Sequence, residues 1–213
     1  MSTRPRTKDE RAATVARLRK EQARAERRRM LVVAGVAGTL VLGLVATATV
    51  VLVGEARRTS ALEAQAAADI EGVESFDGLV FDHVEGSVDY AQNPPAGGAH
   101  NAVWQNCGVY DAPVVDEHAV HSLEHGAVWL TYDPDLPTDQ VALLEQHAAD
   151  QSYVLVSPYE GLPSPVVATA WGHQLQLAAA DDDRIDVFVR KYLLNPELPE
   201  AGALCSNGIG QPA

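Results

Sequence analysis

The sequence lacks charged side chains over one long stretch and has few basic ones beyond it. Residues 31–54 contain no Asp, Glu, Lys or Arg, whereas residues 1–30 contain eleven Lys/Arg and four Asp/Glu. Residues 55–213 contain five Lys/Arg and 25 Asp/Glu. The net charge of −13 therefore combines a basic end of +7 with an acidic remainder of −20. Such asymmetry indicates separate parts. It argues against a nucleic-acid partner for the acidic part, because phosphates would be repelled.

The uncharged stretch predicts a transmembrane helix over residues 31–53. It has 23 apolar or small residues in a row, and a helix needs about 20 to cross the roughly 30 Å hydrocarbon core. A cleaved signal peptide is the alternative, because Ala46-Thr47-Ala48 resembles a cleavage site. The apolar run continues past that site, however, and the apolar part of a signal peptide is only about 7–15 residues long. We therefore expect an uncleaved, single-pass anchor.

The charges beside the apolar stretch predict its orientation. Arg27, Arg28 and Arg29 precede it, and only Arg57 and Arg58 follow it closely. Short flanks rich in Lys/Arg stay in the cytoplasm, so we expect residues 1–30 to form a basic cytoplasmic tail. Residues 54–69 are expected to form a helical stalk, and residues 70–213 a domain outside the cell membrane. Within the span, Ala34 and Gly38 form a small-xxx-small pair suited to a homodimer.

The acidic part predicts an α+β domain, a small mixed sheet with packed helices. Strand-forming runs and turn residues predict strands at 78–81, 84–90, 127–132 and 153–157, and an extended run at 166–177 with a bulge at Gly172. Apolar spacing predicts one helix at 138–150 and another after Asp183. Two prolines and two glycines make residues 93–100 a loop, and residues 113–118 read as irregular.

The sequence has only two cysteines, Cys107 and Cys205, and no C-x-x-C pair. Both fall in the part expected outside the membrane, where thiols oxidise. We therefore predict a disulfide between them. A metal-binding or redox pair is the alternative, which the missing C-x-x-C spacing disfavours.

Four of the seven histidines lie at turns or loop edges, where scaffolds often present functional groups. They are His83, His100, His121 and His125. His121 and His125 share one face in either a helix or a strand, and Glu124 joins them only in a helix. We expect His121 and His125 at the edge of a strand that begins at Gly126.

The other three histidines carry weaker signals. His118 and His147 lie in acidic or helical surface settings, so we expect them to be solvated. His173 follows Trp171-Gly172 and is expected to face either the core or a site.

Residues 121–125 read H-x-x-E-H, the signature of inverted zinc peptidases. That chemistry needs two histidines on the metal and a glutamate that activates water, all held by a sustained helix. Gly126 and a run of β-forming residues follow at once, which leaves no room for a long helix. We therefore do not favour a metallopeptidase.

Four motifs recur in an order that resembles the DUF3105 family of bacterial, membrane-anchored proteins of uncharacterised function. They are PPAGGAH, VWQNCGVY, HSLEHGAVWLTY and YVLVSPYEGLPSPVVATAWG, and the resemblance covers Asp82 to about Gly210. The family often reads PPTSGPH where this chain reads PPAGGAH, so Pro94, Pro95, Gly98 and His100 match and the other three positions depart. The resemblance implies a domain and a membrane location, without an activity.

Three hypotheses for function follow from the side chains. The first is a binding or assembly module of the cell envelope, with an envelope protein as partner and structural histidines. The second is a copper or zinc site made by His100, His121 and His125, with His83 or Glu124 as a further ligand. The third is an enzyme that uses Glu124 and a histidine as acid and base. We favour the first, because histidines at loop edges are often only satisfied polar groups.

The metal hypothesis sets a distance condition. Ligating nitrogens lie about 2.0–2.1 Å from zinc, so donor atoms around one ion must come within about 4 Å of one another. Ring nitrogens of His100 and His121 more than about twice that distance apart would exclude a shared ion.

Overall fold

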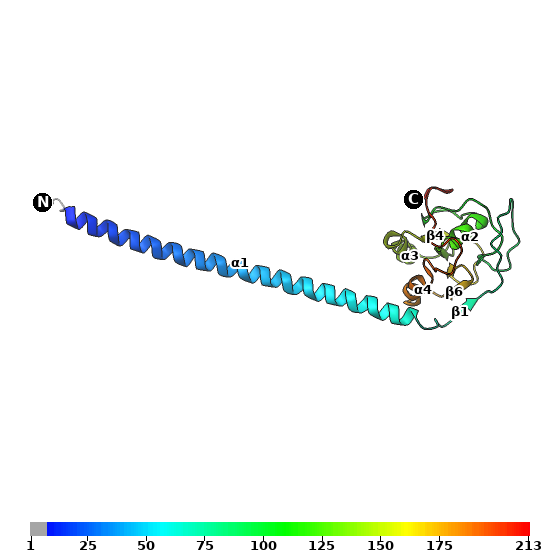
Figure 1. Ribbon diagram of the computed structural model, residues 1–213, viewed down its shortest axis with the longest axis horizontal. Coiled ribbons are helices and arrows are strands. Elements are labelled where there is room, and N and C mark those ends of the chain that lie inside the picture. Colours follow the sequence, from blue (N-terminus) through cyan, green and yellow to red (C-terminus); the bar gives the residue numbers. More distant parts are fainter. Residues whose placement is uncertain (1–7) are drawn as a thin grey trace. The chain divides into compact units, whose positions relative to one another are not determined.

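The computed structural model describes residues 8–213, without the side chains of residues 9–15, 36 and 37 (Figure 1). Residues 1–7, the start of the predicted tail, lie outside the described residues. The chain divides into two compact units, one ending at Arg58 and one running from Thr59 to Ala213.

The first unit is the main part of α1 (Lys8–Ala66), a helix of 59 residues. It runs without a break through the predicted tail, the apolar stretch and most of the predicted stalk. Its most apolar window has a mean hydropathy of 2.4, which makes α1 long and apolar enough to cross a membrane by length and composition. The Thr47 and Thr49 hydroxyls donate to carbonyls one turn earlier, so these polar groups are paired within the helix itself.

The second unit is an α+β domain with one six-stranded mixed sheet in the order β1-β6-β5-β3-β4-β2. The strands are β1 (Val73–Ser75), β2 (Gly108–Val109), β3 (Val128–Tyr132), β4 (Val154–Pro158), β5 (Val166–Ala170) and β6 (His173–Leu177). The helices after α1 are α2 (Asp116–Glu124), α3 (Thr138–Asp150) and α4 (Arg184–Tyr192). Strands β3, β4 and β2 pair in parallel, and the remaining pairs are antiparallel.

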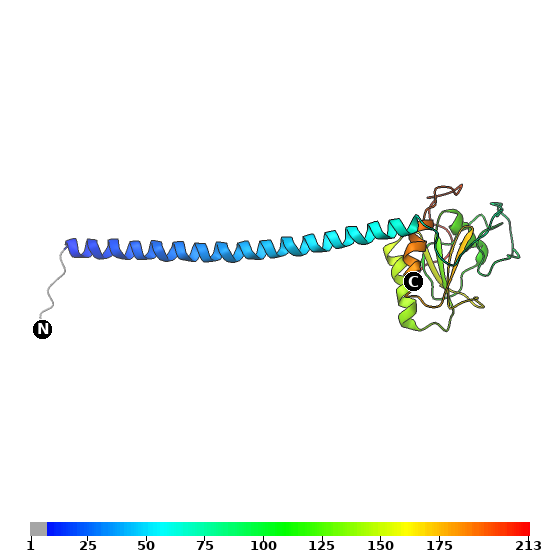
Figure 2. The ribbon, with the colours of Figure 1, turned by 90° about the horizontal axis from the view of Figure 1, so that it is seen from below.

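The two faces of the sheet contribute to different apolar clusters, because successive strand side chains point to opposite sides. On one face Leu130 and Val156 share a buried cluster with Leu144 of α3 and Phe188 of α4. On the other face Trp129 belongs to a smaller cluster with side chains of α2. Figure 2 shows α2 on the opposite side of the strands from α3 and α4.

Several predicted elements are found within one or two residues of their predicted bounds. Residues 127–132 and 153–157 correspond to β3 and β4, and residues 138–150 to α3. The helix predicted after Asp183 is α4. Each has a run or stripe of apolar residues that the core buries, which is the pattern that predicted it.

Three predictions were wrong. Residues 78–81 and 84–90, predicted to be strands, contain no strand. Between the two ranges, His83 makes a single bridge with His100. Gly78 and Gly86 adopt φ values of 73° and 90°, which do not occur in a regular strand. Residues 166–177 form two antiparallel strands, and Gly172, at φ 73°, lies in the turn between them rather than in a bulge.

The third error concerns α2, which covers residues predicted to be irregular or at the edge of a strand. Its nine residues include only three that are apolar and buried, Ala119, Val120 and Leu123. A helix this short gives too few repeats of the apolar spacing to be recognised.

Candidate metal centre

Helix α2 carries the centre of the site. His121 and Glu124 lie three residues apart in this helix, so their side chains share a face, and His125 follows as the residue that caps it. Gly126 then turns the chain toward β3 with φ 94°, and a Cβ at this position would lie 2.8 Å from the Leu194 Cα. The strand edge predicted for His121 and His125 is thus replaced by a helix end, which brings Glu124 to the same side as His121.

A long loop brings two more histidines to α2. His83 and His100 form a parallel bridge, in which the Val84 amide donates to the His100 carbonyl at 2.7 Å. Before His100 the chain passes Gly97 at φ 136°, where a Cβ would lie 3.0 Å from the Trp171 ring. The glycine therefore permits the close approach that carries His100 against the core.

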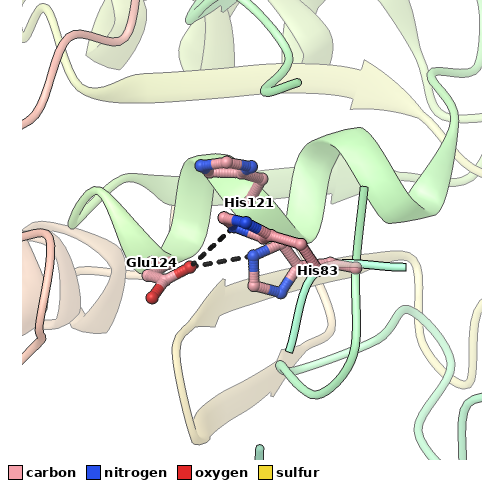
Figure 3. Close-up of side chains that lie close together, drawn as sticks. His83, His121 and Glu124 are labelled. Carbon is pink, nitrogen blue, oxygen red and sulfur yellow. Dashed lines mark ion pairs between the residues drawn. The ribbon is translucent and has the colours of Figure 1, made fainter. Parts of the chain in front are cut away.

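Four of these side chains converge. One donor atom from each of His83, His100, His121 and Glu124 lies within 4.8 Å of all the others. Glu124 Oε2 is 2.8 Å from His100 Nε2. It is 3.9 Å from His83 Nε2, and Figure 3 shows His83, His121 and Glu124 close together. His100, His121 and Glu124 are buried, whereas 42% of the His83 side chain is exposed. The donor atoms of His100 and His121 thus lie within 4.8 Å of each other, well short of the separation that would exclude a shared ion. We call this set the four-donor group.

A second set overlaps the first. His121, His125 and Glu200 also offer donor atoms within 4.8 Å of one another, and we call them the three-donor group. Glu200 Oε2 lies 3.1 Å from His125 Nε2 and 3.7 Å from His121 Nε2. The five candidate donors named from the sequence all belong to one or both groups. Glu200 was missed.

The signal for Glu200 was indirect. It lies five residues before Cys205, and the structure joins Cys205 to Cys107 by a disulfide with Cα atoms 5.3 Å apart. The predicted disulfide brings this segment near Cys107, but it does not distinguish Glu200 from Glu197 of the same segment.

Backbone carbonyls fix the orientation of three histidine rings. The Nδ1–H groups of His100, His121 and His125 donate to the carbonyls of Gly98, Asn101 and Leu204 at 2.8, 2.6 and 2.8 Å. A carbonyl only accepts, so Nδ1 carries the proton and Nε2 of a neutral ring keeps its lone pair. Metal-ligating histidines are held in the same way, with the second nitrogen donating to a carbonyl or carboxylate.

Two buried atoms of the four-donor group are left without hydrogen bonds among the described residues. These are His100 Nε2 and Glu124 Oε2, although they lie only 2.8 Å apart. An imidazole lone pair and a carboxylate oxygen repel each other unless a proton or a cation lies between them. Buried polar atoms are almost always paired, and leaving one unpaired costs about 1–3 kcal/mol.

Burial favours the neutral forms of these groups, which prepares the imidazoles for a metal ion, whereas the Glu124 carboxyl must lose its proton to bind one. Burial raises the pKa of Glu124 to about 7, and the negative charge of Glu200 adds to the rise. Burial also lowers the pKa of His100, and it lowers that of His121 to about 4. The two buried imidazoles are therefore neutral at neutral pH, which is the form that binds metal ions.

The remaining three histidines lie outside both groups and have partners of their own. His118 Nδ1 bonds the Val103 carbonyl, and His147 Nδ1 lies 3.7 Å from Asp186. Both are partly buried rather than fully solvated. His173 bonds Ser75 and stacks on the Tyr192 ring.

The geometry also bears on the H-x-x-E-H pattern. Helix α2 ends at Glu124, so the sustained helix of the inverted zinc peptidases is absent here. The Glu124 carboxylate lies among the donor atoms themselves, 2.8 Å from His100 Nε2. This position suits a ligand better than a base that activates a water on the metal.

Fold and site together define an α+β domain that follows a long apolar helix and gathers histidines and carboxylates around α2. The chain belongs to the family whose model is described as a protein of unknown function (DUF3105), which matches residues 83–207. The matched range includes every residue of both donor groups and both cysteines. Neither a curated protein nor a solved structure matches the chain.

Proposed function

We propose that this protein is a metal-binding protein anchored to the cell membrane, which holds one zinc or copper ion through His83, His100, His121 and Glu124. The observation that carries the proposal is the pair of buried atoms, His100 Nε2 and Glu124 Oε2, that face each other without a hydrogen bond. If the histidines were only structural, each ring would be satisfied separately. Here the Nδ1 atoms of His100 and His121 are each satisfied by a backbone carbonyl, while donor atoms of all four residues lie within 4.8 Å of one another.

The donor set favours zinc or copper over other ions. Three imidazoles and one carboxylate complete the four ligands that zinc prefers, and imidazole also suits copper. Magnesium and calcium prefer oxygen ligands, of which the four-donor group offers only the carboxylate. The cysteines take no part, because both are joined in the disulfide.

We further propose that residues 31–53 of α1 cross the membrane, with residues 1–30 in the cytoplasm and residues 70–213 outside. The arginines at 27–29 support this orientation. The Cys107–Cys205 disulfide supports it too, since disulfides persist in oxidising compartments. Ala34 and Gly38 are both exposed on α1 and remain our candidates for pairing two such helices.

Metal content of the full chain, purified in detergent, tests the proposal. After dialysis with zinc or copper(II) and removal of the excess, we expect one equivalent per chain in the parent. His121→Ala should lose it, because His121 belongs to both donor groups. His147→Ala is the matched control, a partly buried histidine outside both groups. A His121→Ala protein that keeps the metal content of the parent and is merely less stable would contradict the proposal and favour structural histidines.

A further inference from the structure

We infer that the two donor groups are alternative positions of a single ion, which enters or leaves at the three-donor group and rests at the four-donor group. This inference rests on the proposed function. Its basis is that His121 belongs to both groups, each with its own histidines and its own carboxylate. The ion would move by exchanging the other ligands while it stays bound to His121.

The two groups cannot each hold a metal ion bound to His121 at the same time. The Nδ1–H of His121 donates to the Asn101 carbonyl at 2.6 Å, so only Nε2 is available to a metal. One imidazole nitrogen has one lone pair and holds one ion at a time. A bridging imidazolate between two ions is excluded while that hydrogen bond is in place. The overlap therefore produces two exclusive positions rather than a two-metal centre.

The two positions differ in how completely they enclose an ion. The four-donor group supplies all four ligands of a tetrahedral zinc ion, and its carboxylate is buried, with the Glu124 side chain 4% exposed. The three-donor group supplies one ligand fewer, which leaves a place for water or an incoming ligand, and the Glu200 side chain is 43% exposed. An ion exchanges with the solution more readily at the group that has an open ligand position and an exposed carboxylate.

Glu200 is held in place by contacts that do not involve its own carboxylate. The Gly202 amide donates to the His125 carbonyl at 3.0 Å, and the Leu204 carbonyl accepts from His125 Nδ1. Cys205 fixes the same segment to Cys107. The three-donor group is therefore built by the fold, rather than by one exposed acidic side chain that happens to lie near a histidine.

His83 provides a rival route, because it also reaches the surface and belongs to the four-donor group. The comparison of Glu200→Gln with the parent separates the two routes. Glu197→Gln is the matched control, an exposed glutamate three residues away that belongs to neither group. All three proteins are used as full chains in detergent, with zinc as the probe, and the rates of zinc uptake and of zinc release to a chelator are measured.

We expect one zinc per chain in all three proteins. In Glu200→Gln, uptake and release should both slow by about tenfold, a change at the low end of charge effects on ion association. The dissociation constant at equilibrium should stay within about threefold of the parent value, because the resting ligands are intact. Glu197→Gln should match the parent in every measurement.

Three outcomes would overturn the inference while leaving the proposed function standing. Two zinc ions bound together would show that the positions are not exclusive. Unchanged rates in Glu200→Gln would assign the route to His83. Slower zinc uptake with unchanged release would mean that Glu200 only attracts the ion electrostatically and does not bind it on the way in or out. A parent chain that binds no zinc or copper would remove both the proposed function and the inference.

Discussion

The two faces of the sheet are held in different ways. The face covered by α3 and α4 is an apolar cluster, with Val128, Leu130 and Phe188 all fully buried. The face toward α2 has a smaller apolar cluster and buries polar side chains beside it. There the Trp129 indole donates to Ser157 at 3.0 Å, and the Gln174 amide donates to the Pro94 carbonyl at 2.6 Å. Burial of apolar area stabilises the packing on the α3/α4 face. On the α2 face, individual hydrogen bonds between buried side chains also fix the packing.

This difference explains why the site lies where it does. On the face toward α2, buried polar groups such as Trp129 and Gln174 have hydrogen-bond partners. His100 Nε2 and Glu124 Oε2 are buried there without a hydrogen bond. Each such buried group without a hydrogen bond lowers the free energy of unfolding by about 1–3 kcal/mol. Burial of apolar side chains on the α3/α4 face offsets this loss. We therefore expect substitutions on the α3/α4 face to change stability alone, and those in the donor groups to change metal binding.

The largest effect should come from Phe188→Ala on the α3/α4 face. Phe188 is fully buried, and removal of a buried aromatic ring costs about 3–5 kcal/mol of folding free energy. Urea unfolding of the full chain in detergent, followed by tryptophan fluorescence, measures the loss. The fraction that remains folded should bind the same amount of zinc as the parent. A folded Phe188→Ala protein with less metal per chain would show that the two faces are not independent.

A smaller loss is expected when the disulfide on the site side of the domain is broken. Cys107→Ser should cost about 2–5 kcal/mol, since the bridge closes a long loop. It should also slow zinc uptake and release, because Cys205 holds the segment that carries Glu200. Mass spectrometry of the exported parent without reduction should find one intramolecular crosslink and no free thiol. Free thiols in fresh protein, or a variant as stable as the parent, would rule out this role.

The third effect has the opposite sign, a gain in stability that depends on pH. The folded-state pKa of Glu124 is about 7, above its ordinary value of 4.5, so between these values the folded state holds more protons than the unfolded state. Glu124 therefore lowers the stability of the metal-free protein as the pH rises through this range. Glu124→Gln should remove that decrease and be more stable than the parent at pH 8, by about 1–3 kcal/mol.

Urea unfolding at pH 5 and pH 8 in the presence of a chelator checks this prediction, with Glu197→Gln as the control. The margin between Glu124→Gln and the parent should grow with pH. A parent at least as stable as Glu124→Gln at pH 8 would mean that the carboxylate is already satisfied without a metal ion.

The contrast between the two faces also explains how far the sequence could predict the structure. Strand β3 is a run of five buried residues between Gly126 and Asp133-Pro134, and α4 has an apolar stripe, so both could be recognised from a repeating pattern. The site has no repeating pattern. The His121 ring is fixed by the Asn101 carbonyl and the His125 ring by the Leu204 carbonyl, contacts between segments that lie far apart in the sequence.

Residue chemistry identified the five histidine and glutamate candidates, but their convergence needed tertiary structure. Helix α2 was too short to recognise, and its helical form is what brings Glu124 to the side of His121. Glu200 is one of two acidic residues in the segment after α4, and the hydrogen bonds of Gly202 and Leu204 place it beside His125.

X-ray absorption spectroscopy of the full chain loaded with one equivalent of zinc tests the central claim most directly. The account predicts a four-coordinate ion with nitrogen and oxygen ligands at about 2.0–2.2 Å, imidazole scattering from three rings, and no sulfur ligand near 2.3 Å. In His100→Ala the imidazole contribution should fall by one ring. A sulfur ligand, or a shell of water oxygens without imidazole, would contradict the assignment of His83, His100, His121 and Glu124 as the metal site.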